Sequence, residues 1–80
     1  MFLQTENNGY LAIGKIAQLT AAKTDFGFDA VAVIDGKHVS ISSFEEEMDS
    51  SSPEMRAFDC IDRILEAFEK GRKVITLQDI

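Results

Sequence analysis

The sequence predicts one α+β domain over residues 1–80, with an antiparallel sheet of four to five strands and one amphipathic helix packed on one face. Two turn signals in the first half, Asn8-Gly9 and Asp35-Gly36, lie between apolar segments and predict two β-hairpins. In the second half, apolar residues recur at helical spacing between Pro53 and Gly71. A chain of 80 residues has room for only one core.

The first hairpin should join a strand from Phe2 to Glu6 with a strand that starts at Tyr10, because Asn and Gly tolerate the positive φ of a tight turn. Residues 11–22 fit either a second strand or a helix. Gly14 inside a helix would cost about 1 kcal/mol relative to alanine, which favours the strand. Residues 23–25 then form a turn that leads into Phe26.

The second hairpin has a predicted two-residue type I′ turn at Asp35-Gly36. Regular pairing away from this turn predicts four cross-strand pairs on one apolar face: Ile34 with Lys37, Ala32 with Val39, Ala30 with Ile41, and Phe28 with Ser43. The opposite face carries Val31 and Val33 together with polar residues, so these two valines have no partner in the predicted core.

A serine-rich, acidic segment precedes the predicted helix. Ser52 as N-cap with Pro53 in the first helical position, or a capping box of Ser51 and Glu54, starts the helix within one residue. Gly71 should end it. The stripe expected to face the core consists of Phe58, Ile61, Leu65 and Phe68. Val74 to Leu77 should form a last short strand.

The net charge of −6 is concentrated between residues 44 and 69, which carry −7. Nucleic-acid binding depends on clustered Lys and Arg that neutralise phosphates, so this balance argues against a nucleic-acid partner and against an anionic membrane surface. No apolar run approaches the ~18 residues of a membrane helix, and the first residues do not look like a signal peptide. We therefore expect a cytoplasmic protein.

The pattern resembles short bacterial and phage-borne proteins with a pleckstrin-homology-like arrangement of sheet and carboxy-terminal helix. The resemblance rests on Phe2-Leu3, Gly9-Tyr10, Ile16, Val31-Ala32-Val33, Asp35-Gly36, Val39, Ile61 and Leu65. It implies an interaction scaffold and transfers no catalytic residue. The acidic, serine-rich insertion and the continuation past the helix depart from that pattern.

Few residues could support catalysis. His38 and Cys60 are the only histidine and cysteine. The predicted elements separate them, since His38 lies beside the tight turn and Cys60 lies on the helix. No metal-ligand or phosphate-binding motif occurs, so we expect no cofactor and no metal site.

Two features could bind a protein partner or a second copy of the chain. The first is an exposed sheet edge, either Phe2 to Glu6 or Val74 to Leu77. The second is an apolar patch of Phe26, Val31 and Val33, although the simpler interpretation is that the valines are good strand formers. The candidate interaction residues are Phe26, Val31, Val33, Glu45, Glu46, Glu47, Val74 and Thr76.

The leading hypothesis is a small, non-enzymatic interaction module that self-associates through a sheet edge or through the face that carries Val31 and Val33. The first alternative is an acidic, phage-type inhibitor that presents Glu45, Glu46, Glu47 and the acidic residues of the helix to a basic nucleic-acid-binding protein. The second alternative is an enzyme that uses His38.

Overall fold

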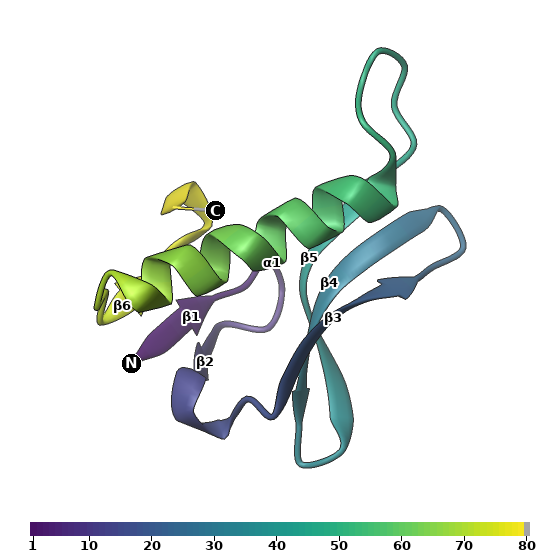
Figure 1. Cartoon of the computed structure of the whole chain (residues 1–80). Helices are drawn as coiled ribbons and strands as arrows, with labels where there is room; N and C mark the ends of the chain where they lie inside the picture. Colours follow the sequence, from purple (N-terminus) through teal and green to yellow (C-terminus); the bar gives the residue numbers. More distant parts are fainter. Residues whose placement is uncertain (80) are drawn as a thin grey trace.

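The computed structural model describes residues 1–79 and confirms the α+β class, with the strands grouped into two three-stranded sheets under one helix. The elements are β1 (Phe2–Gln4), β2 (Tyr10–Ala12), the 3-10 turn η1 (Ile13–Lys15), β3 (Gln18–Lys23), β4 (Gly27–Ile34), β5 (Lys37–Glu45), α1 (Pro53–Glu69), β6 (Val74–Ile75) and the 3-10 turn η2 (Leu77–Asp79). One sheet has the order β2-β1-β6 and the other β3-β4-β5, and α1 runs across both (Figure 1).

The first hairpin forms, but its loop is longer than the predicted two residues. Phe2 pairs with Ala12 and Gln4 with Tyr10, so the loop covers residues 5–9. Buried Thr5 organises it, because its Oγ1 donates a hydrogen bond to the Gly9 carbonyl at 2.7 Å and accepts one from the Asn8 amide at 2.8 Å. Within this loop Gly9 has a positive φ and Asn8 does not. The prediction of a tight two-residue turn at Asn8-Gly9 was therefore wrong.

Residues 11–22 do not form the α-helix that was the alternative, and the predicted strand is confirmed only in part, because it is divided between β2 and β3 in different sheets. β2 and β3 are separated by η1, a single 3-10 turn that contains Gly14. β3 then pairs antiparallel with β4 along its whole length, from Gln18 opposite Val33 to Lys23 opposite Phe28.

The second hairpin has the predicted tight turn, with φ of 51° at Asp35 and 75° at Gly36. Ile34 pairs with Lys37 and Ala32 with Val39, as expected. Beyond these pairs the predicted register was wrong, because a β-bulge leaves Ile41 without a partner in β4. Ala30 therefore pairs with Ser42 and Phe28 with Phe44, in place of Ile41 and Ser43.

The bulge joins the two sheets. The amide of Glu6, in the loop after β1, donates a hydrogen bond to the Ile41 carbonyl at 2.8 Å. Asn8 Nδ2 donates to the Ser40 carbonyl at 2.9 Å from the same loop. The extra residue in β5 thus supplies an acceptor that would otherwise be part of the β4–β5 ladder.

Helix α1 begins and ends where the sequence indicates. Ser52 is the N-cap and accepts a hydrogen bond from the Met55 amide at 3.2 Å, with Pro53 in the first helical position. At the other end Gly71 has a φ of 77°, and the amides of Gly71 and Arg72 donate to the carbonyls of Phe68 and Ala67. This pair of bonds is the Schellman motif, for which glycine is favoured.

The face that α1 buries is rotated from the predicted one. The buried helical residues are Pro53, Ala57, Cys60, Ile61, Ile64 and Ala67. Of the expected core stripe only Ile61 is buried, whereas Phe58, Leu65 and Phe68 are 48%, 48% and 46% exposed. The core beneath the helix includes the small side chains of Ala30 and Ala32, which let the helix approach the sheet with its own small residues inward.

The edges of the first sheet also differ from expectation. β1 lies between β2 and β6, so the segment from Phe2 to Glu6 is not a free edge. β6 is an edge, but it contains only Val74 and Ile75 and runs parallel to β1. Within residues 1–79, no helix is long and apolar enough to cross a bilayer.

Candidate functional site

An apolar groove lies between α1 and the start of β3. It has a volume of about 370 Å³. Its lining includes Ile13, Ile16, Leu19, Ile61, Leu65 and Phe68. We call this surface the α1/β3 groove. It exists because the helix directs Ala57, Cys60 and Ala67 at the sheets, which leaves Leu65 and Phe68 beside the sheet instead of beneath the helix.

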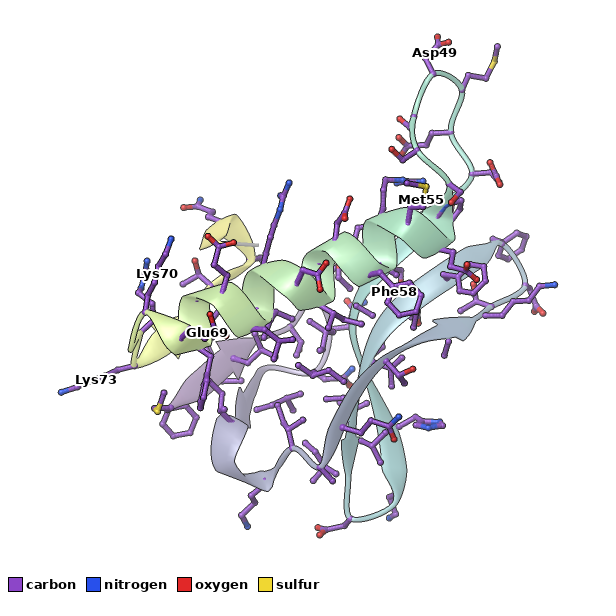
Figure 2. The ribbon with its side chains drawn as sticks, viewed as in Figure 1. Asp49, Met55, Phe58, Glu69, Lys70 and Lys73 are labelled. Carbon is purple, nitrogen blue, oxygen red and sulfur yellow. The ribbon has the colours of Figure 1, made fainter. Side chains whose placement is uncertain are left out.

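The exposed apolar side of α1 continues along the helix from this groove. Figure 2 shows Phe58 on the side of α1 that faces β3 and β4, about two turns before Leu65. About half of each large side chain is accessible, although each also contacts the fold. Exposed apolar side chains that form a contiguous patch are typical of protein contact surfaces.

Strand β3 forms one outer edge of its sheet, directly beside the groove, which Gln18 and Leu19 help to line. It is six residues long and has no charge between its two ends. The Thr24 amide donates to the Gly27 carbonyl at 2.8 Å where the β3–β4 hairpin closes. Because alternate residues of an antiparallel strand face the partner strand, Thr20 and Ala22 bond toward β4, and Leu19, Ala21 and Lys23 direct their peptide groups outward.

A second, more polar pocket of about 420 Å³ lies on the other side of α1 and is lined in part by Glu6, Ser42, Arg56, Cys60 and Arg63. Burial raises the pKa of the Cys60 thiol from 9.0 to about 11, against a smaller opposing effect of Arg63 and with a further increase from Glu6. The thiol is therefore protonated at neutral pH. A protonated, buried thiol is a poor nucleophile.

Arg56 fastens the acidic loop to the body of the protein. Its guanidinium lies 5.6 Å from the centre of the Phe44 ring. Nε donates to the Ser51 carbonyl at 3.1 Å and Nη2 donates to the Glu45 carbonyl, so one side chain holds both ends of the loop. Residues 46–50 project away from the body, with Asp49 at the tip (Figures 1 and 2).

The structure does not gather the predicted interaction residues into one site. Phe26, at the β3–β4 turn, is 76% exposed and lies at the same end of the sheet as Glu45, which pairs with the neighbouring Gly27. Glu45, Glu46 and Glu47 are exposed where β5 passes into the acidic loop. Val74 and Thr76 lie in or beside β6, in the other sheet; Val74 is 42% exposed and Thr76 is half-buried.

The predicted patch of Phe26, Val31 and Val33 does not form. Val31 is only 4% exposed and Val33 is half-buried. Val31 lies in the central strand between Thr20 and Ser40, and the Ser40 hydroxyl donates to Asp29 at 3.0 Å on the same face. Val31 is therefore not available for contact, whereas Phe26 is exposed and Val33 is partly accessible.

Sequence reasoning missed the α1/β3 groove because it assigned Leu65 and Phe68 to the core. A signal was present: Ala57, Cys60, Ile61, Ile64 and Ala67 also recur at helical spacing, and Ala30 and Ala32 on β4 are equally small. Small residues on both surfaces indicate a close approach of helix and sheet, and the larger apolar residues must then lie at the sides of the helix.

His38 and Cys60 lie on separate parts of the fold. His38 pairs with Val33 beside the tight turn and is exposed. Cys60 belongs to α1 and is buried. Among residues 1–79, no group of three or more His, Cys, Asp or Glu side chains is arranged to hold a metal ion.

Comparison with known proteins finds no matching family model, no matching curated protein and no matching solved structure. The resemblance to pleckstrin-homology-like proteins stays a prediction.

Proposed function

We propose that this chain is a small, cytoplasmic, non-enzymatic interaction module that self-associates through the edge of β3. The observation that carries the proposal is a six-residue edge strand, with its only charge at Lys23 at one end, beside an apolar groove. Edge strands that offer free peptide groups pair readily with another strand, and natural proteins usually block them with charge, proline or a covering loop. The middle of β3 has none of these sequence features.

The other edges support pairing less well. The loop of residues 5–9 already bonds to the Ser40 and Ile41 carbonyls of β5. β2 and β6 contain three and two residues, too few for a stable ladder.

A second candidate is the acidic inhibitor, in which the loop of residues 46–50 contacts a basic protein. The projecting loop favours it, since Met48 at 92% exposure stands between acidic residues and offers an apolar contact among charges. Such a complex would form through opposite charges and would weaken as salt is added.

The test is sedimentation of the wild-type chain and an Ala21→Lys variant over a range of concentrations. Ala21 is half-buried on the helix-facing side of the edge strand, so a lysine there can reach solvent in the monomer but is covered when a second strand pairs. We expect a concentration-dependent dimer for the wild type and dimerisation at least about tenfold weaker for the variant, as for an added ~1.4 kcal/mol.

The matched control is His38→Lys, which adds a similar charge at an exposed strand position on β5. It should dimerise like the wild type. Circular dichroism melting of all three proteins separates loss of pairing from loss of the fold. A wild-type chain that stays monomeric at millimolar concentration overturns the proposal.

A further inference from the structure

Phe26 is the most exposed aromatic residue within residues 1–79. It precedes β4 in the turn that follows β3, and this turn is ordered by two hydrogen bonds between Thr24 and Gly27, at 2.8 and 3.1 Å. The core of its own chain therefore does not use this ring, although the turn holds the residue at a defined place.

The pairing proposed for β3 determines what a second copy brings to the groove. Two β3 strands related by a two-fold axis run antiparallel. A register centred on Ala21 places Leu19 opposite Lys23 of the second copy and uses every outward-facing residue of both strands. The turn that follows β3 in the second copy, which contains Phe26, then lies beside the start of β3 in the first copy, next to Ile16.

Ile16 lines the α1/β3 groove together with Leu19, Leu65 and Phe68. The second β3 would lie one strand spacing from the first, about 4.8 Å away, on the open side of the groove. We infer that Phe26 of one copy docks in the α1/β3 groove of the other, once in each direction. This inference rests on the proposed self-association through β3.

The size and chemistry of the groove agree with this occupant. The groove measures about 370 Å³ and its lining is mostly apolar, which suits an aromatic ring. α1 packs mainly against β4, so the two helices of the pair would be about three strand spacings, ~14 Å, apart. Direct helix packing needs about 8–10 Å, and the half-exposed Phe58 side chains would occupy the space between the helices.

The first experiment compares Phe26→Ala with Met48→Ala by sedimentation equilibrium. Both variants remove a large, exposed apolar side chain, at 76% and 92% exposure, so the monomer fold should tolerate both. The Phe26→Ala homodimer loses two docking contacts. We expect its dissociation constant to rise about a hundredfold, at about tenfold per contact, and that of Met48→Ala to stay unchanged.

The second experiment tests whether the two surfaces meet. Leu65→Glu places a carboxylate in the groove at a half-exposed helical position, and its homodimer should weaken like that of Phe26→Ala. A mixture of the two variants forms a heterodimer that keeps one intact contact, between Phe26 of the Leu65→Glu chain and the groove of the Phe26→Ala chain. This heterodimer should be about tenfold tighter than either homodimer.

Met55→Glu is the control for the helix substitution, because Met55 is also exposed on α1 but does not line the groove. It should leave dimerisation of its own homodimer unchanged, and its heterodimer with Phe26→Ala should be about tenfold weaker than that homodimer, because only one contact remains. If Ala21→Lys abolishes the dimer while Phe26→Ala has no effect, or if the mixture shows no gain, the docking of Phe26 is wrong and pairing through β3 stands. If the wild type does not dimerise, both are wrong.

Discussion

Two glycines show how one backbone contact determines tolerance to substitution. Gly27 opens β4 opposite Glu45, and a Cβ on it would collide with the backbone carbonyl oxygen of Phe44. Gly14 in η1 has nothing within 4 Å of the Cβ position and does not need a positive φ. The two positions therefore differ in steric space and not in conformational demand.

We predict that Gly27→Ala lowers the free energy of unfolding by about 2 kcal/mol, because the strand end must move to admit the methyl group. Gly14→Ala should leave stability unchanged or raise it by about 0.4–1 kcal/mol, since alanine restricts the unfolded chain. Urea unfolding monitored by circular dichroism measures both. Equal effects of the two substitutions would contradict the steric explanation.

Burial of the Cys60 thiol leads us to predict that the stability of the fold depends on pH. Its thiol pKa is raised by burial from 9.0 to about 11, so the unfolded chain loses the proton first. Its stabilising contribution is complete below pH 9 and is lost as the pH rises towards 11. Allowing for partial solvent contact through the neighbouring pocket, we expect a loss of about 1–2 kcal/mol.

The measurement is the unfolding free energy of wild type and Cys60→Ala at several pH values between 8 and about 11. The difference between the two proteins isolates the thiol, because both share every other ionisable group. The stability gap should narrow as the pH rises. A gap that stays constant would show that the thiol titrates alike in the folded and unfolded chains.

At the scale of elements, turn and cap chemistry could be read from local sequence. Asp35-Gly36, Ser52-Pro53 and Gly71 each specify a conformation through their own backbone preferences, and each lies where expected. The pairing register of a strand farther from its turn depends on residues that are distant in the sequence. The bulge at Ile41 depends on an acceptor offered to Glu6, which is 35 residues away in the chain.

The prediction of which face of α1 is buried was wrong for a related reason. Both stripes on the helix satisfy helical periodicity, and only the sheet surface beneath decides which one is buried. That surface is small at Ala30 and Ala32, so the larger side chains of Leu65 and Phe68 lie at the side and form the groove. The candidate site is thus formed by apolar side chains of α1 that are too large to fit between the helix and the sheet.

At the scale of the whole molecule, the α+β class follows from the order of turn signals and helix pattern, but the division into two sheets does not. The first sheet is completed by parallel pairing of β1 with β6, the two ends of the chain. Parallel pairing across such a separation leaves no turn signal in the sequence. α1 then covers both sheets with one buried face (Figure 1).

The net charge of the molecule separates self-association from the acidic-inhibitor alternative. Each copy carries a net charge of −6, so two copies repel each other at long range, and the repulsion is screened as ionic strength rises. We predict that the wild-type dimer becomes several-fold tighter as sodium chloride is raised from about 50 to about 500 mM, over which the Debye length falls well below 10 Å. Sedimentation equilibrium at each concentration measures this.

Loop charge supplies the matched control for this salt dependence. The double variant Glu46→Gln/Glu47→Gln removes two exposed charges from the projecting loop and should dimerise at least as tightly as the wild type at low salt, with a smaller gain from added salt. A dimer that weakens with salt would mean that opposite charges hold it, since apolar burial and backbone pairing are not screened. Because the sign of the slope differs between attraction of unlike charges and repulsion of like charges, one titration decides which force dominates the surface.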